Sequence, residues 1–149
     1  MSEKIVSVNR KASHDYFLVE RFEAGIVLTG TEIKSIRKGK VQFKDAYITF
    51  IKNEAYIKEM HIAPYDHGNI FNHDETRERK LLLHKLEIRK LQQKVNLKGF
   101  TIVPCKMYLK NGRAKLEIAL AKGKDLYDKR QDDKIKTAKR EMERALKLR

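Results

Sequence analysis

The sequence has few of the residues that indicate an extracellular or membrane-bound protein. Its 149 residues include one cysteine, Cys105, and no tryptophan. A single cysteine cannot form an internal disulfide and suits a reducing compartment. No apolar run approaches the roughly 20 residues of a membrane span, and residues 1–11 contain no apolar stretch that could serve as a signal peptide. These absences predict a cytoplasmic protein that does not contact a membrane.

Acidic residues are also in short supply relative to basic ones. The chain has 34 Lys+Arg against 20 Asp+Glu and a formal net charge of +14. Such an excess indicates a polyanionic partner, and nucleic acid is the commonest one. A basic domain that is merely soluble stays open as an alternative. An anionic membrane surface is the weaker interpretation, because a basic membrane binder normally presents Trp, Phe or Leu on an apolar face.

Constellations that carry catalysis or hold metals are missing as well. His67 and His73 lie near Asp66 and Asp74, but a structural zinc site needs four well-spaced N/S ligands and Cys105 has no cysteine companion. We identify neither the convergent carboxylates of a metal-dependent nuclease nor a Gly-rich phosphate loop. The sequence therefore predicts no metal, no cofactor and no enzymatic activity.

What the sequence does contain is a series of short β-branched and aromatic segments that predict strands. The predicted strands are 16–22, 26–28, 47–51, 55–60, 101–110 and 113–121. Residues 52–54 join one pair as a short polar turn. Asn111-Gly112 joins another, and both positions of this dipeptide tolerate positive φ. We expect two β-hairpins.

Two helices are predicted between these strands. Thr29 precedes Glu32 at the spacing of a capping box, which indicates a helix over 30–38. Asp74 can cap a second, Leu-rich helix that would run over 74–98. Short strands with few helices favour a small closed β-barrel, and the oligonucleotide-binding fold is an obvious candidate. The pattern alone does not select that fold over an α+β sandwich.

The composition changes near residue 123, which predicts a domain over 1–122 and a basic tail over 123–149. The tail has ten Lys/Arg and six Asp/Glu. Its apolar residues recur at three- and four-residue steps, which permits an amphipathic helix. Isolated helices of this length are marginal in water. We therefore expect the tail to become helical only against a surface.

Basic residues occur beside groups that could stack on bases or bond to RNA, such as Tyr16. RNA recognition combines phosphate clamps with stacking platforms for unpaired bases. Each charge taken singly is more simply a solvated surface residue, so the prediction rests on their sum. The candidate RNA-binding residues of the domain are Asn9, Arg10, Lys11, His14, Glu23, Lys34, Arg77, Arg79, Lys80, Leu83, Lys115, Lys122 and Lys124.

Seven segments form an ordered set of motifs. They are Asn9-Arg10-Lys11-Ala12, residues 23–35 (EAGIVLTGTEIKS), Asp45-Ala46-Tyr47, residues 79–83 (RKLLL), Val103-Pro104, residues 121–124 (AKGK) and Asp128-Lys129-Arg130. In this order they resemble small protein B, the family of tmRNA-binding proteins. The resemblance covers nearly the whole chain.

The resemblance implies an oligonucleotide-binding-type β-barrel with flanking helices and a tail that becomes helical on the ribosome. It implies an adaptor that binds the tRNA-like domain of tmRNA, delivers it to stalled ribosomes and senses the empty mRNA channel with its tail. The expected partners are tmRNA and the ribosome, chiefly its small subunit. Alanyl-tRNA synthetase and elongation factor Tu would be met through the tmRNA complex. The alternative is a general single-stranded RNA chaperone.

The resemblance also implies roles for particular residues. By motif, Asn9, His14, Glu23, Leu83 and Lys115 belong to the surface that grips the tRNA-like domain, although Leu83 without the family pattern would be assigned to the core. One departure is Asp125, where family members often carry Lys. The expected contacts to the ribosomal decoding centre are Tyr127, Asp128, Lys129, Arg130, Lys134, Lys136, Lys139 and Arg140.

Overall fold

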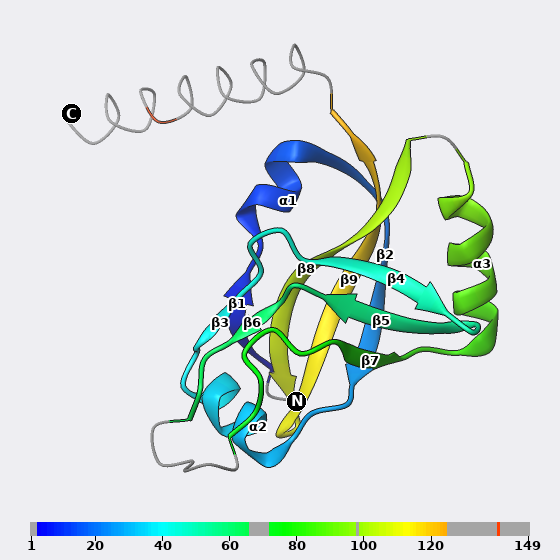
Figure 1. Cartoon of the computed structure of the whole chain (residues 1–149). Helices are drawn as coiled ribbons and strands as arrows, with labels where there is room; N and C mark the ends of the chain where they lie inside the picture. Colours follow the sequence, from blue (N-terminus) through cyan, green and yellow to red (C-terminus); the bar gives the residue numbers. More distant parts are fainter. Residues whose placement is uncertain (1–2, 66–71, 98, 125–139, 141–149) are drawn as a thin grey trace.

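The computed structural model describes residues 3–65, 72–97, 99–124 and 140 (Figure 1). Helices α1, α2 and α3 span Arg10–Asp15, Gly30–Arg37 and Lys85–Val95. The strands, in order from β1 to β9, are Glu3–Val8, Tyr16–Ile26, Val41–Gln42, Tyr47–Ile51, Glu54–Lys58, His61–Ile62, Arg79–Leu82, Phe100–Lys110 and Arg113–Gly123.

Most of these strands form one antiparallel sheet. Seven of them follow the order β1-β8-β9-β2-β7-β5-β4, and β3 pairs separately with β6. The sheet curls so that β4, at one edge, packs against β8 near the other edge (Figure 1). The curled sheet encloses the core, where Ile57, Leu81 and Ile118 are buried. The prediction of a mainly β protein with flanking helices is confirmed.

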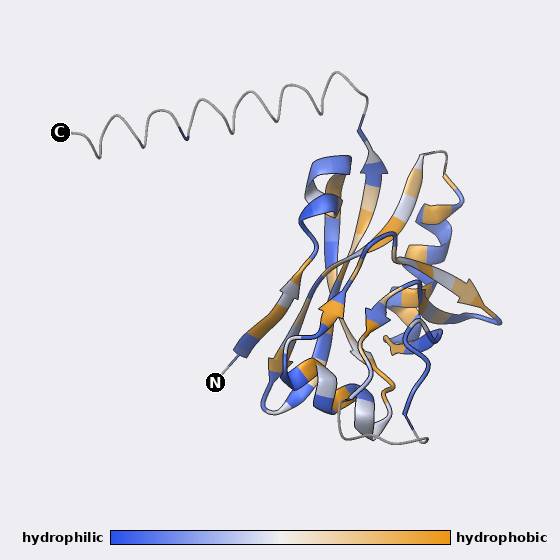
Figure 2. Cartoon of the chain, turned by 60° about the vertical axis from the view of Figure 1, so that its left-hand side comes forward, coloured by the Kyte–Doolittle hydropathy of each residue, from blue (hydrophilic) through white to orange (hydrophobic). Residues whose placement is uncertain are grey.

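Alternation along the strands determines which side chains enter this core. Hydrophilic and hydrophobic residues follow one another along the strands (Figure 2). Because successive strand residues point to opposite faces, one face of the curled sheet is apolar and the other carries charge. Leu91 of α3 is also buried in the core cluster. The charged outer face is where a polyanion can bind.

Both predicted hairpins form, and their turns explain why. Lys52 and Asn53 have φ of 50° and 63° between β4 and β5, and Asn111 and Gly112 have φ of 52° and 78° between β8 and β9. Positive φ at both central residues matches the right-handed twist of the flanking strands. The prediction of separate strands at 16–22 and 26–28 is wrong, because β2 runs unbroken to Ile26 along its partner β9.

Helix α2 begins as its capping box predicts. The Thr29 side chain accepts a hydrogen bond from the backbone N–H of Glu32, whose carboxylate accepts one from the Thr29 N–H at 2.8 Å. Ile36, on the inner face of the helix, is buried in the core. These reciprocal bonds satisfy two backbone donors that a helix start would otherwise leave unpaired.

The predicted helix over 74–98 is half wrong. Residues 79–82 form β7, which pairs with β2 on one side and β5 on the other, and the helix begins only at Lys85. The spacing of apolar residues alone did not distinguish a strand from a helix at residues 79–82. Pairing on both sides satisfies the backbone groups of β7 and outweighs any helical preference. Short elements before residue 16, β1 and α1, were not predicted.

Candidate RNA-binding surface

A groove on the charged outer face brings together four of the predicted RNA-binding residues. We define the groove by Glu23 of β2, Lys80 of β7, Leu83 between β7 and α3, and Lys115 of β9, with Gly25 of β2 at its floor. These residues line a hollow of about 490 Å³. The sheet pairing β7-β2-β9 brings them together from segments that lie far apart in the sequence.

Glu23 is held in the groove as an ionised acceptor. The Tyr108 hydroxyl donates to Glu23 Oε2 at 2.5 Å, and Lys110 Nζ lies 3.6 Å from the same oxygen. The Tyr108 hydrogen bond is the main reason that the pKa of Glu23 lies below its ordinary value, and Lys110 and Lys115 act in the same direction. A fixed carboxylate can accept from a base amino group or a ribose hydroxyl.

Gly25 allows β2 and β7 to pack closely at the groove. In the sheet register it lies between Leu82 of β7 and Lys115 of β9. A Cβ added at Gly25 would lie 3.2 Å from Leu82 Cβ, closer than ordinary van der Waals contact. The absent side chain therefore lets the Leu82 side chain pack closely against the β2 backbone.

The remaining groove residues differ in how firmly they are held. Lys80 Nζ lies 2.9 Å from Glu54 Oε2, and this hydrogen bond raises the pKa of Lys80. Leu83 is half-buried and packs against the core while it also lines the groove. Leu83 therefore belongs both to the edge of the core and to the surface of the groove. Lys115 is half-buried and lies directly across from Gly25.

A second group of predicted residues gathers around α1, away from the groove. Asn9 is the N-cap of α1: its Oδ1 accepts from the Ala12 N–H at 3.2 Å and its Nδ2 donates to the Pro104 carbonyl at 2.8 Å. The Asn9 amide is thus used to fix the helix to β8. Arg10, the first residue of α1, is exposed.

The strand end beside α1 adds further cations to this group. The Lys124 N–H donates to the Asp15 carbonyl at 2.9 Å, and Lys124 Nζ donates to the Ser13 carbonyl at 3.1 Å. His14 Nδ1 lies 3.0 Å from Asp15 Oδ1. Lys122 is exposed near the C-terminal end of β9. Two basic residues that are distant in the sequence, Lys122 and Lys124, therefore lie near the C-terminal end of α1.

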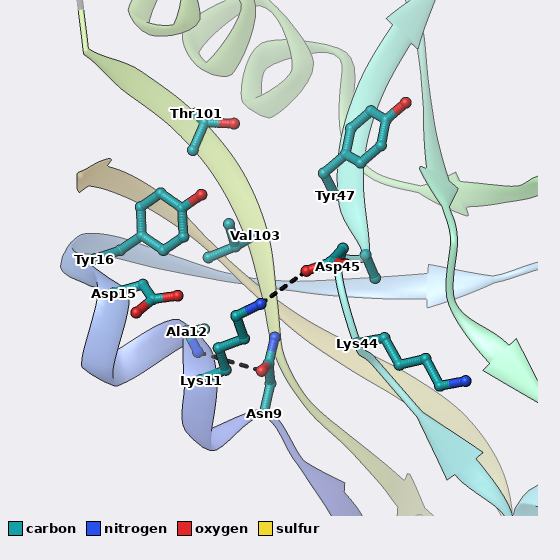
Figure 3. A pocket seen from close by; sticks show the side chains of 11 residues that line it. Asn9, Lys11, Ala12, Asp15, Tyr16, Lys44, Asp45, Tyr47, Thr101 and Val103 are labelled. Carbon is teal, nitrogen blue, oxygen red and sulfur yellow. Dashed lines mark hydrogen bonds and ion pairs between the residues drawn. The ribbon is translucent and has the colours of Figure 1, made fainter. Parts of the chain in front are cut away.

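Lys11 belongs to a hollow beside this helix (Figure 3). Its Nζ lies 2.8 Å from Asp45 Oδ1, and the carboxylate is the main reason that the pKa of Lys11 is raised. Tyr16 and Tyr47 lie on opposite sides of the same hollow, with Thr101 of β8 between them (Figure 3). The pattern of basic residues beside aromatics indicated Tyr16 as a stacking residue, whereas Tyr47 stood out only as part of the Asp45-Ala46-Tyr47 motif.

Arg79 contradicts its prediction as an RNA-binding residue. Its side chain is fully buried, donates from Nε to the buried carboxylate of Glu32 and donates from Nη1 to the Met60 carbonyl at 2.7 Å. The alternation of β7 turns Arg79 inward and Lys80 outward. Arg79 ties α2 to the strand edge and cannot reach RNA.

Arg77 and Lys34 have placements of their own. Arg77 Nη2 donates to Glu32 Oε1 at 2.6 Å and to the Val27 carbonyl at 3.2 Å, so much of its guanidinium is committed to the protein. Lys34 Nζ lies 5.2 Å from the centroid of the Tyr65 ring. Neither residue lines the groove. Arg77 precedes strand β7 and is not part of a helix, contrary to the predicted helix over 74–98.

Tyr108, which holds the groove residue Glu23, is a buried residue that sequence reasoning missed. The signal was present, because strand alternation puts Lys106, Tyr108 and Lys110 on one face of the predicted hairpin. What the alternation does not give is the neighbour of that face. Only the pairing of β9 with both β8 and β2 brings Tyr108 to Glu23.

Other predictions concern metals, the lone cysteine and membranes. Among the described residues, no three His, Cys, Asp or Glu side chains group as metal ligands, while His67 and Asp66 lie outside those residues. Nδ1 of His73 lies 2.9 Å from the Thr31 hydroxyl. Burial raises the pKa of the Cys105 thiol to about 11. In the part of the chain that the structure describes, no helix is long and apolar enough to cross a membrane.

The predicted ribosome contacts lie almost entirely outside the described residues. This holds for Asp125 and for Tyr127, Asp128, Lys129, Arg130, Lys134, Lys136 and Lys139. Arg140 is described and is exposed.

The profile of the SmpB protein family matches residues 6–148. The chain belongs to the SmpB family. It is 58% identical to the SsrA-binding protein of Lysinibacillus sphaericus over 146 residues, which cover 98% of this chain and 94% of that protein. It is 54% identical to the SsrA-binding protein of Clostridium tetani, with the same coverage.

A solved structure also resembles this member of the SmpB family. It is described as "tmRNA-SmpB: a journey to the center of the bacterial ribosome". The two chains share 48% sequence identity with a TM-score of 0.69, and the match covers 89% of this chain and 93% of the other. The fold expected from the resemblance is therefore confirmed in its mainly β architecture.

Proposed function

We propose that this protein is a tmRNA-binding adaptor of trans-translation, in which the groove grips the tRNA-like domain of tmRNA. The observation that carries the proposal is the convergence of Glu23, Lys80, Leu83 and Lys115 in one hollow. Membership of a family whose relatives are SsrA-binding proteins supports it, as does similarity to a chain of a tmRNA-SmpB structure.

The chemistry of the groove suits folded RNA. Lys80 and Lys115 can bind phosphates, and Leu83 can pack on a sugar or a base. The carboxylate of Glu23 would repel a phosphate, so it sets a position where only a donor fits. A groove that combines both signs of charge can discriminate an RNA shape, whereas a uniformly basic strip would bind any strand.

The remaining parts of the proposal concern the tail and the chemistry that the protein leaves to others. Residues 1–122 form the tmRNA-binding domain, and residues 123–149 contact the ribosome when the mRNA channel is empty. Ordering the tail costs about 1–2 kcal/mol per residue in backbone entropy, so its folding would need many contacts with ribosomal RNA. The protein acts by binding and not as an enzyme, in the cytoplasm where ribosomes translate.

The test is to purify the tagged protein from cells and sequence the RNA that accompanies it. We expect one dominant tmRNA species. A broad mixture of unstructured RNAs would instead support a general single-stranded RNA chaperone. A gel-shift series with residues 1–122 then tests the domain boundary, and loss of most binding in this truncated protein would contradict it.

The role of the tail needs a separate assay. Deletion of residues 131–149 should leave tmRNA binding intact but abolish peptide tagging of a non-stop message in reconstituted translation. Normal tagging by the deleted protein would contradict the tail's proposed role and leave the groove's role untouched.

A further inference from the structure

A second hollow, on the side of the molecule near α1, has the features of a site for one nucleotide. Figure 3 shows Tyr16 and Tyr47 on opposite sides of the hollow, with Thr101 and Val103 of β8 between them in this view. Its volume is about 320 Å³, at the small end of the range of about 300–1,000 Å³ for ligand pockets. We call it the tyrosine hollow. It shares no lining residue with the groove.

The aromatic walls favour a flat ligand. Tyr16 comes directly after α1 and Tyr47 begins β4, so the two rings stand on separate elements that the curled sheet brings together. Tyr47 is 42% exposed although it is a large apolar ring. Within the described residues, neither tyrosine hydroxyl forms a hydrogen bond. The exposed ring of Tyr47, the half-buried ring of Tyr16 and their free hydroxyls together suit a base, which stacks through its face and bonds through its edge.

The charged groups of the hollow can reorganise around a ligand. Lys11 and Asp45 form an ion pair across the hollow, yet their side chains are 62% and 85% exposed. Such exposed pairs contribute little to stability, so either partner can turn toward a ligand at small cost. Asp45 can accept from the amino group of a base, and Lys11 can bind a phosphate.

The loop that carries Lys44 gives a further indication. Lys44 has φ of 44°, in the left-handed region that a residue with a side chain rarely adopts. The Ala46 N–H donates to the Phe43 carbonyl at 2.7 Å and closes this turn. A glycine or asparagine would fit the turn with less strain. The lysine that stands there instead is exposed and lines the tyrosine hollow, as backbone strain often accompanies a binding function.

We infer that the tyrosine hollow binds one unpaired nucleotide, with the base between Tyr16 and Tyr47 and its phosphate at Lys11 or Lys44. The inference rests on the proposed function only for the choice of RNA. The nucleotide belongs either to the tRNA-like RNA held in the groove or to ribosomal RNA, and the chemistry of the site is the same for both.

The experiment is chemical footprinting of single bases, first on the isolated tRNA-like RNA and then on small ribosomal subunits. We expect the wild-type protein to protect one unpaired base that Tyr47→Leu exposes, while the protections made by the groove remain. Tyr47→Phe keeps the ring and should keep the protection. Because stacking on an aromatic side chain is worth about 1–3 kcal/mol per base, Tyr47→Leu should weaken RNA affinity by about 5- to 150-fold.

Two further results complete the test. Asp45→Asn removes an exposed carboxylate charge and its exposed ion pair with Lys11, and it should weaken the same single protection without a change in melting temperature. Loss of the base in only one of the two RNAs identifies its source. If Tyr47→Leu and Asp45→Asn both give the wild-type footprint on both RNAs, the inference is wrong.

The proposed function fails separately. In that case the wild-type protein would bind the tRNA-like RNA no better than an unrelated RNA of equal length, and Lys115→Glu would make no difference. The tyrosine hollow would still be tested, because its footprint can be measured on any RNA that the protein binds.

Discussion

Strand β7 carries two neighbouring cations that point to opposite faces of the sheet. Arg79 points inward, is fully buried and meets the carboxylate of Glu32. Lys80 points outward, is partly exposed and lines the groove. Both belong to the same RKLLL segment, and sequence reasoning assigned both to RNA. Because successive residues of a strand point to opposite faces, two neighbouring cations can have different roles: here one stabilises the fold and the next one lines the groove.

Removing the inward cation should have the largest effect. Arg79→Met leaves the Glu32 carboxylate buried with only Arg77 as an ionic partner. Breaking a buried ion pair in this way costs about 3–5 kcal/mol. We expect a large fall in the free energy of unfolding, measured in urea, whereas Lys80→Gln should unfold like the wild type.

A second substitution sharpens this result. In Arg79→Met combined with Glu32→Gln, no buried carboxylate loses its partner, so part of the lost stability should return. Equal instability of Lys80→Gln and Arg79→Met would mean that the two faces of β7 do not differ as described.

Acid should reveal the same inward pair with a smaller effect. Burial opposes ionisation of Glu32, but hydrogen bonds from Arg77, the Thr29 N–H and Arg79 outweigh it and hold its pKa below the ordinary value of 4.5. A depressed folded-state pKa contributes stability above the unfolded value, and this contribution is lost as the pH falls below 4.5 toward the folded pKa. The loss should be smaller than in Arg79→Met, because a protonated carboxyl still accepts hydrogen bonds.

The measurement is the free energy of unfolding from about pH 7 to pH 3. Glu32→Gln should be less stable than the wild type at pH 7 and should lose less stability on acidification. An identical acid dependence of the two proteins would show that other carboxylates govern the response.

The outward face should respond in RNA binding and not in stability. Lys115→Glu reverses a charge that lies across from Gly25 in the groove. We expect RNA affinity to fall at least about tenfold at low salt, because one cation fewer displaces condensed counterions. The slope of log affinity against log salt should become shallower. Lys94→Glu, at the last turn of α3 and outside the groove, is the matched control.

The smallest expected effect concerns Tyr108, which positions Glu23. Tyr108→Phe removes one hydrogen bond, worth about 0.5–1.5 kcal/mol, so RNA affinity should fall about two- to twelve-fold. The pKa of Glu23 should rise toward its ordinary value, which an NMR titration of its carboxyl measures. In a Glu23→Gln background the same change should matter less. An equal loss of affinity in both backgrounds would mean that Tyr108 acts on RNA without Glu23.

Features that depend on adjacent residues could be predicted from the sequence. The Thr29–Glu32 capping box, the two hairpins and the Asn111-Gly112 turn are local, and each formed as expected. The family resemblance likewise implied a mainly β fold, and three of the five residues that it assigned to one surface, Glu23, Leu83 and Lys115, do lie together in the groove. Local hydrogen bonds and backbone preferences determine the capping box, the hairpins and the turn, so a short window of sequence is enough to predict them.

What only the tertiary structure decided is which face each residue presents and what lies opposite it. β7 became a strand because β2 and β5 both pair with it, and that pairing turned Arg79 into the core. Tyr108 meets Glu23 only across β9, and Tyr16 and Tyr47 line one hollow only because the sheet curls and brings the start of β2 near β4. These contacts join residues far apart in the chain, and their energies arise from burial and pairing that no local pattern contains.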